Sequence, residues 1–265
     1  MQNARSRPKG CDSMGKKHGG LVSAASCLAI GLGALATSGI IAATVETAAG
    51  VQREYDQSCM PSGFYPRFAK RALDVAIGLA ALPIVGTVTA VCGAAVKLED
   101  GGPAFYNAPR VGLGGREFTM YKLRSMKVNA PDLVMEDGST YNGADDPRMT
   151  RVGAFLRKTS LDEIPQFLNV LKGDMSVVGP RPDLRRETEL YKGEEVLKLT
   201  VKPGVTGYAA VYGRNSLPWH DRLALDVHYV RNMNLAMDAK VFARTFTAVF
   251  NQEGIYVEQE AAQGK

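Results

Sequence analysis

Residues 145–183 read DDPRMTRVGAFLRKTSLDEIPQFLNVLKGDMSVVGPRPD. An acidic pair, Asp162 and Glu163, lies at the centre of this stretch, where the apolar spacing of a helix begins over Leu161–Leu171. Ser160 and Glu163 form the S-x-x-E pattern of a capping box, and the helix dipole favours acids in a first turn. The stretch therefore predicts a helix with both carboxylates at its N-terminus.

Basic residues surround this acidic pair in the sequence. They are Arg148, Arg151, Arg157, Lys158, Arg181, Arg185 and Arg186. Nearby positive charge lowers the pKa of a carboxyl group, so both acids are expected to stay ionised. An ionised carboxylate can bind a hard cation such as Mg²⁺ or attack phosphorus. The capping interpretation thus competes with a catalytic one, in which Asp162 and Glu163 react and bind metal.

Two basic motifs are candidates for phosphate binding. Gly179-Pro180-Arg181-Pro182 fixes the backbone on both sides of one arginine, which aims its guanidinium at little entropic cost. Lys122-Leu123-Arg124 follows an alternating strand pattern at Glu117–Tyr121, so Lys122 and Arg124 are expected on one face. Taken alone, each such motif is more often a solvated surface charge than a phosphate ligand.

The rest of the region 98–257 has the pattern of a mixed, helix-rich α+β domain. Helical spacing covers Leu235–Phe250, and short strands are predicted at Ser176–Val178 and Tyr208–Tyr212. A short tail, 258–265, follows this domain.

An uncharged run of 22 residues, Val75–Val96, precedes the domain. As a straight helix it would be roughly 33 Å long, enough to cross a bilayer. Pro83 lies at its middle and removes a backbone hydrogen bond, which predicts a broken helix. We therefore expect a membrane helix over 69–97 that is broken near Pro83; a buried core helix is the alternative.

A second run without charge covers Gly19–Val45, 27 residues. We expect a membrane segment over 19–45; a signal peptide and the start of a soluble segment are the alternatives. The basic tail 1–18 before it is expected to be disordered, and 46–68 to be a polar linker.

The bulk composition favours anionic partners, because the net charge is +5 and the pI about 9.0. These partners could be nucleic acid, lipid headgroups or phosphorylated substrates. Two long apolar runs and the lack of aromatic–basic alternation argue against nucleic acid. The four cysteines are scattered, which argues against a disulfide framework or a zinc site.

The motifs, taken in order, resemble those of the monotopic bacterial phosphoglycosyl transferases, or bacterial sugar transferases. The resemblance runs from about Phe68 to Tyr256. The matching pieces are Lys70-Arg71-x-x-Asp74, the apolar run with Pro83, Gly102-Pro103-x-Phe105, Arg110-Val111-Gly112, Phe118-x-Met120-Tyr121-Lys122-x-Arg124-Ser125-Met126, Asp146-Pro147-Arg148, Thr150-Arg151-Val152-Gly153, Ser160-Leu161-Asp162-Glu163-x-Pro165-Gln166, Asn169-Val170-Leu171-x-Gly173-Asp174-Met175-Ser176, Gly179-Pro180-Arg181-Pro182, Lys202-Pro203-Gly204-Val205-Thr206-Gly207 and Gly213-Arg214-Asn215.

This resemblance implies an enzyme that moves a sugar-1-phosphate from a UDP-sugar to polyprenyl (undecaprenyl) phosphate and releases UMP. It would thereby initiate exopolysaccharide, capsule or glycan assembly. Asp162 would attack the sugar-bearing phosphate and form a covalent intermediate, with Glu163 binding metal or managing a proton. The implied cofactor is Mg²⁺, with Mn²⁺ as a substitute. The implied phosphate and nucleotide ligands are Lys122, Arg124, Arg181, Arg148, Arg110 and Arg214.

The resemblance also implies a place in the cell. The proline-broken helix enters one leaflet and returns, with Lys70, Arg71, Asp74 and Pro83 as its membrane-associated residues. Lys70 and Arg71 are expected to anchor to the headgroups of an anionic bilayer. The catalytic domain would face the cytoplasm at the bacterial inner membrane, near downstream glycosyltransferases. A non-catalytic protein that binds anionic lipid is the rival, but an acidic pair would weaken such a surface.

Overall fold

The computed structural model describes residues 61, 63–135, 138–141, 143, 146–213 and 217–250, and the backbone of 42–46 and 52–56. The helical elements are η2 (Tyr65–Ala69), α1 (Lys70–Asp100), η3 (Leu113–Gly115), α2 (Arg151–Thr159), η4 (Leu161–Glu163), α3 (Gln166–Lys172), α4 (Arg185–Glu189), η5 (Gly193–Thr200), α5 (Tyr208–Tyr212), α6 (Trp219–Asn232) and α7 (Leu235–Phe250). The strands are β1 (Ala42–Glu46), β2 (Gln52–Asp56), β3 (Ala108–Val111), β4 (Glu117–Met120), β5 (Ser176–Val178) and β6 (Gly204–Thr206).

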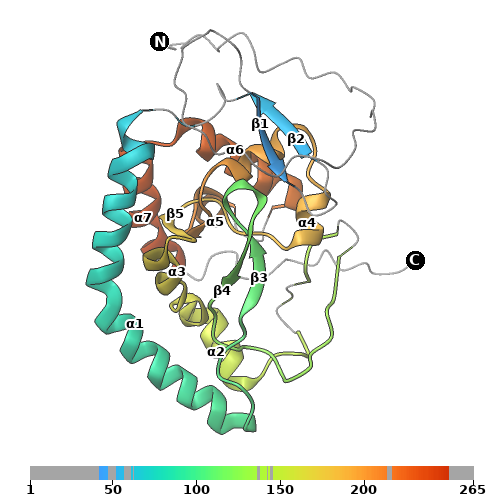
Figure 1. Cartoon of the computed structure of the whole chain (residues 1–265). Helices are drawn as coiled ribbons and strands as arrows, with labels where there is room; N and C mark the ends of the chain where they lie inside the picture. The colour runs from blue at the N-terminus through green and yellow to red at the C-terminus, as the bar shows by residue number, and fades with distance from the viewer. Residues whose placement is uncertain are drawn as a thin grey trace, which may run out of the picture.

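The fold is helix-rich α+β, as the sequence predicts, with three separate two-stranded sheets in the described part of the chain. β3 pairs antiparallel with β4, so that Ala108 lies opposite Met120, and β5 pairs parallel with β6. The main core packs buried side chains of β5 against α6 and α7, among them Val177, Leu223 and Val241. Figure 1 shows the helices arranged around the small sheets.

The local predictions have mixed outcomes. The strands at β4 and β5 and the helix α7 are confirmed. The strand predicted at Tyr208–Tyr212 is wrong, because this segment is the helix α5. Its alanines favour a helix, and the burial of Ala209 and Val211, two residues apart, imitates the alternation of a strand.

β1 and β2 form an antiparallel hairpin in which Ala43 lies opposite Tyr55. β1 uses the last residues of the run Gly19–Val45, and β2 lies in the region predicted as a linker. The remainder of the 19–45 run, the tail 1–18 and the tail 258–265 lie outside the described residues.

Helix α1 is continuous through Pro83, so the predicted break is wrong. A proline removes one amide from the helical ladder and crowds the carbonyl four residues earlier, which can bend a helix without ending it. The Thr87 hydroxyl donates to the Pro83 carbonyl over 2.9 Å, one turn further along. Figure 1 shows α1 curving along one side of the domain without turning back on itself.

Three polar residues at the start of α1 attach it to the domain. Lys70 is buried in an ion pair with Asp238 of α7. Arg71 donates to the carbonyls of Val170 and Leu171, over 2.6 and 3.0 Å, at the end of α3. Both basic side chains therefore bind protein groups in this structure, not the headgroups that the sequence analysis expects.

Asp74 completes this attachment. Its Oδ1 accepts hydrogen bonds of 2.9 Å from the Ser176 hydroxyl and from the backbone N–H of Val177 in β5. Asp74 is 4% exposed, so water could not replace its carboxylate as the acceptor for these two donors.

Asp74→Ala is expected to destabilise the protein by about 2–4 kcal/mol, because two buried donors lose their acceptor. Thermal unfolding in detergent measures this loss, and Lys97→Ala, an exposed site on the same helix, serves as control. An unchanged melting temperature in Asp74→Ala would contradict the assigned role.

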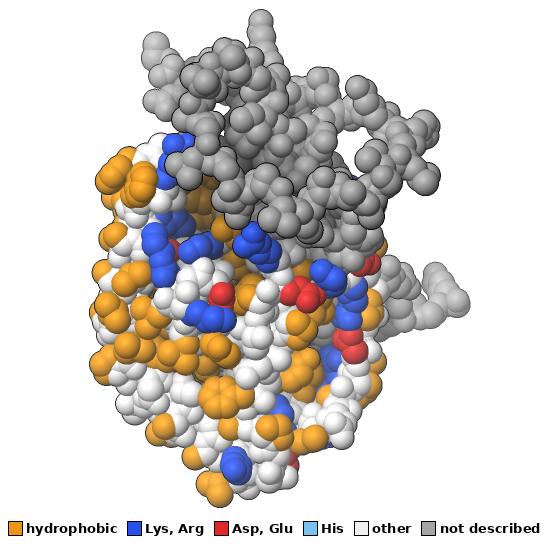
Figure 2. All heavy atoms as spheres, viewed as in Figure 1, with side chains coloured by type: hydrophobic (Ala, Val, Ile, Leu, Met, Phe, Trp, Pro, Cys, Tyr) orange, Lys and Arg blue, Asp and Glu red, His pale blue; other side chains and the backbone are white. Residues whose placement is uncertain are grey.

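The outer face of α1 is apolar and exposed. Leu79, Ile84 and Val91 are 55%, 64% and 65% exposed. The continuous helical stretch Tyr65–Asp100 has 36 residues and is long and apolar enough to cross a membrane, with 11% of its most apolar window buried. Figure 2 shows hydrophobic side chains along the edge of the molecule that α1 forms. This face thus has the composition of a lipid-contacting surface.

Candidate active site

The acidic pair lies in the one-turn helix η4, between α2 and α3. Ser160 ends α2 in a left-handed conformation, at φ 57°, and its side chain makes no capping hydrogen bond. The capping-box interpretation is therefore wrong. The turn points Asp162 inward, where it is 1% exposed, and leaves the Glu163 side chain 20% exposed.

Lys122 joins the two acids. Its Nζ lies 2.9 Å from Asp162 Oδ2 and 3.3 Å from Glu163 Oε1. The backbone N–H of Leu123 donates to the Asp162 carbonyl over 2.9 Å, which fixes the Lys122 segment against the turn. Lys122 thus forms an ion pair with both candidate catalytic acids.

Arg181 reaches the same pair from the proline-flanked loop. Its Nη1 and Nη2 each lie 3.3 Å from Glu163 Oε1, and its side chain is 57% exposed. The loop itself is held to β6, since the Gly179 N–H donates to the Thr206 carbonyl over 2.8 Å. The exposed guanidinium remains accessible to an anion from solvent.

The two acids differ in their pKa. Burial acts to raise the pKa of Glu163, but Lys122 and Arg181 outweigh it and lower this pKa to about 2. For Asp162 burial dominates and raises the pKa, with Glu163 adding to the rise and Lys122 and Arg157 opposing it. The expectation of lowered values is confirmed for Glu163 and wrong for Asp162, because the surrounding arginines do not compensate for its complete burial.

Arg157 of α2 is the residue whose role the sequence left undefined. It was one of several basic neighbours of the acids, and the structure places its charge where it favours ionised Asp162. The two residues are five apart and separated by the left-handed Ser160, so helical spacing does not predict this proximity.

Arg124 has different partners from Lys122, so the expectation of a shared face is wrong. Its Nη1 and Nη2 bind Asp100 at the end of α1 over 2.7 and 2.5 Å. Its Nε donates to the Pro103 carbonyl over 2.7 Å. The chain leaves the strand after Met120, and with it the alternation on which the expectation depended.

Arg148 is also occupied by protein groups. Its Nη2 binds Asp146 over 2.6 Å, and its Nη1 donates to the Pro131 carbonyl over 2.9 Å. Arg124 and Arg148 are both 5% exposed and fix the irregular segment between β4 and α2. Neither is therefore part of the site that we describe around Asp162.

Arg110 lies close to Arg181, since the N–H of Val111 donates to the Asp183 carbonyl over 3.0 Å. Burial and the charge of Arg181 lower the pKa of Arg110. Its Nη1 is buried and has no hydrogen-bond partner among the described residues. Two adjacent guanidinium groups, one with an unused donor, form a site suited to a phosphate. Arg214 lies outside the described residues.

Figure 2 shows Lys and Arg side chains across the middle of the face that carries α1 along its edge. Positive groups and an apolar edge therefore share one side of the molecule.

The residues present fit Mg²⁺ only in combination with a substrate. No group of three or more His, Cys, Asp or Glu in the described part of the chain is placed to hold a metal ion. Asp162 Oδ2 is buried, with Lys122 as an ion-pair partner but no hydrogen bond of good geometry. One or two carboxylates completed by phosphate oxygens and water is the coordination Mg²⁺ adopts with nucleotides. The donor set is thus compatible with a metal shared with a diphosphate.

Comparison with known proteins identifies the family. The family model described as bacterial sugar transferase matches residues 65–252. The chain belongs to the bacterial sugar transferase family.

Curated relatives agree with this assignment. An uncharacterized sugar transferase of Haemophilus influenzae is 40% identical over 72% of this chain and 42% of its own length. The exopolysaccharide production protein ExoY of Rhizobium meliloti is 40% identical over 71% of this chain and 88% of its own. The undecaprenyl-phosphate galactose phosphotransferase of Salmonella typhimurium is 39% identical over 72% of this chain and 42% of its own. This bacterial sugar transferase therefore spans less than half the length of several relatives but nearly all that of ExoY.

Proposed function

We propose that this bacterial sugar transferase moves a sugar-1-phosphate from a UDP-sugar to polyprenyl phosphate, of the undecaprenyl type, and releases UMP. The observation that carries the proposal is the buried Asp162 carboxylate paired with Lys122, beside the accessible guanidinium of Arg181. The names of relatives support it, since they include a phosphotransferase acting on undecaprenyl phosphate and a UDP-galactose-lipid carrier transferase. The product would be the first lipid-linked sugar of an exopolysaccharide, capsule or glycan.

In the first step an Asp162 oxygen attacks the phosphorus that carries the sugar. A bond from that oxygen to phosphorus forms, the bond to the bridging oxygen breaks, and UMP leaves with the electron pair. Asp162 is almost completely buried, so it has little hydration to lose before it attacks. The Lys122 ammonium at 2.9 Å favours the ionised form that the attack requires.

In the second step a phosphate oxygen of the polyprenyl phosphate attacks the same phosphorus and frees Asp162. Dividing one displacement into two is the usual advantage of a covalent intermediate. Glu163, whose pKa is about 2, stays ionised throughout and is unsuited to donating a proton near neutral pH. It holds Lys122 and Arg181 in place and is available as a metal ligand.

Arg110 and Arg181 are the proposed ligands of the diphosphate. Arg181 is exposed, and Arg110, whose charge is close enough to interact with that of Arg181, has an unused buried donor. Phosphate oxygens would satisfy this donor and separate the two repelling guanidinium charges. Arg124 and Arg148 are not included, because their donors already bind Asp100 and Asp146.

The proposed location is the inner membrane, with the catalytic domain on the cytoplasmic side where nucleotide sugars are made. The exposed apolar face of α1 would lie in the bilayer. Lys70, Arg71 and Asp74 fix α1 to the domain, so the active site would be held at a constant height above the lipid phosphate.

The test is a screen for UMP release in nanodiscs, with a panel of UDP-sugars and undecaprenyl phosphate. We expect UMP from at least one donor and a radiolabelled sugar in the lipid fraction. A protein that bound anionic lipid without catalysis would release no UMP from any donor, and this outcome would refute the proposal.

Chelation is expected to abolish turnover. Asp162 and Glu163 are the residues that would hold Mg²⁺, and the ion would neutralise phosphate charge. Excess EDTA should reduce UMP release at least about 100-fold, and added Mg²⁺ or Mn²⁺ should restore it. Full activity in EDTA would exclude a metal requirement.

A further inference from the structure

A buried group of charges lies behind the loop that carries Arg181. Lys198 of η5 lies between two carboxylates, 2.6 Å from Asp183 Oδ2 and 3.1 Å from Asp226 Oδ2 of α6. The Tyr191 hydroxyl donates to Asp183 Oδ2 over 2.5 Å. The side chains of Lys198, Asp183 and Asp226 are 5%, 10% and 3% exposed.

This group has an excess of negative charge when both acids are ionised, because one ammonium faces two carboxylates. Such an arrangement is costly in a core, and packed apolar residues would often be more stable. Asp226 is the less well satisfied acid, since its Oδ1 is buried without a hydrogen-bond partner among the described residues. The position of the group beside the Arg181 loop suggests a function for this energetically unfavourable arrangement.

One member of the buried group belongs to the loop that carries Arg181. Asp183 is two residues after Arg181 and belongs to the same loop. The backbone amide of Arg181 interacts with the Asp226 carboxylate and favours its ionised form. The side chain of Arg181 itself pairs with Glu163.

We infer that Asp226 is a positioning residue for Arg181: its ionised carboxylate holds the loop through the Arg181 amide and through Lys198, and its protonation loosens the loop. The inference rests on the proposed function, in which Arg181 binds the diphosphate. It deepens that function by adding a pH-dependent control of substrate binding.

Of the four titratable residues in this buried group, Asp226 is the one that changes charge near neutral pH. Burial, with repulsion by Asp183, raises the pKa of Asp226 to about 6, against the opposing effect of Lys198. The pKa of Lys198 is raised and that of Asp183 lowered, so both keep their charge. Burial raises the pKa of Tyr191, which stays neutral.

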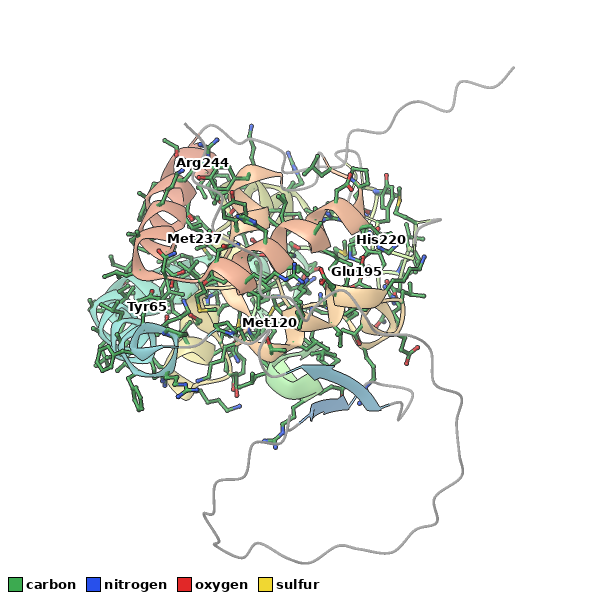
Figure 3. All side chains as sticks on the ribbon, turned by 90° about the horizontal axis from the view of Figure 1, so that it is seen from above. Tyr65, Met120, Glu195, His220, Met237 and Arg244 are labelled. Atoms are coloured by element: carbon green, nitrogen blue, oxygen red, sulfur yellow. The ribbon has the colours of Figure 1, made fainter. Side chains whose placement is uncertain are left out.

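The groups whose charge or hydrogen bonding acts on Asp226 are Lys198 of η5, Asp183 and the Arg181 amide of the loop, and Tyr191 after α4. The other titratable groups on η5 and α5, the helices packed against α6, are Glu194, Glu195, Tyr208 and Tyr212. The helix α6 itself adds His220, Asp221, Arg222, His228, Tyr229 and Arg231. Figure 3 shows η5 and α6 side by side, with Glu195 and His220 facing each other at their outer ends. The Lys198–Asp226 pair joins the same two elements on the inner side.

The sign of the pH effect follows from the raised pKa. Above pH 7 Asp226 is ionised in the wild type, and the loop is held. Below pH 5 it is protonated and resembles asparagine in charge and shape. The rate constant kcat/KM for the UDP-sugar of wild type should therefore exceed that of Asp226→Asn at least about tenfold at pH 7.5, and the ratio should approach one near pH 5.

Measuring this ratio from pH 5 to 8.5 tests the inference, and the titration of Asp162 cancels in it. Asp226→Glu should recover part of the ratio and its pH dependence. Asp221→Asn, an exposed acid on the same helix, should behave like wild type at every pH. A ratio that does not change with pH would assign Asp226 a purely structural role and overturn the inference.

A second measurement does not depend on turnover. Hydrogen–deuterium exchange of the peptide covering 179–184 should be faster in Asp226→Asn than in wild type at pH 7.5. Equal exchange would overturn the inference even if the enzyme is active. Absence of UMP release by wild type, with faster exchange in the variant, would instead refute the proposed function alone.

Discussion

Asp162→Asn is expected to abolish UMP release while the protein stays folded. The amide keeps the shape of the carboxylate but removes the charge that attacks phosphorus. Because Asp162 is 1% exposed and its pKa is raised by burial, the neutral side chain should cost no stability. The rate should fall at least about 1000-fold, the scale of losing a nucleophile in other enzymes.

The matched control is Glu189→Gln, which makes the same chemical change at an exposed site. Mass spectrometry of wild type quenched with a UDP-sugar should find the phosphosugar on Asp162. A trapped adduct on another residue, or near-normal turnover by Asp162→Asn, would refute the covalent role of Asp162.

The sequence was sufficient to locate the acidic pair and Arg181, because both lie in motifs that constrain their own backbone. Two prolines flank Arg181, and a single turn carries Asp162 and Glu163. The helix α7 was also predictable, since its apolar spacing is local. Features decided by a few neighbouring residues can thus be recognised without a structure.

The roles of the other basic residues depend on distant partners. Lys122 and Arg124 belong to one motif, yet Lys122 binds acids 40 and 41 residues later and Arg124 binds Asp100, 24 residues earlier. Asp100 is in place because α1 continues through Pro83 to its end at Gly101. The spacing within the motif does not predict which distant acid each of the two side chains binds.

The attachment of α1 shows the same limit. Lys70 has the sequence context of a headgroup anchor, but its partner, Asp238, is 168 residues away. A buried Lys–Asp pair across that separation is visible only when α1 and α7 are placed together.

Lys122→Met is expected to have the second largest effect. The change removes the ammonium that lies 2.9 Å from Asp162 and 3.3 Å from Glu163. Glu163 keeps Arg181, but Asp162 loses its nearest positive charge and remains buried beside a like charge. Its pKa should rise further, so a smaller fraction is ionised at neutral pH.

The rate at pH 7 should therefore fall at least about 100-fold and recover as the pH is raised, because a higher pH restores the ionised nucleophile. Protonation of Asp162 would also limit the loss of stability to less than the roughly 3–5 kcal/mol of a broken buried pair.

Lys122→Arg should retain more activity than Lys122→Met, since the positive charge is kept. Lys158→Met, at an exposed site close to the pair in sequence, is the matched control. The measurement is kcat/KM for the UDP-sugar from pH 6 to 9. A variant whose rate is low but does not rise with pH would show that Lys122 acts on the substrate and not through Asp162.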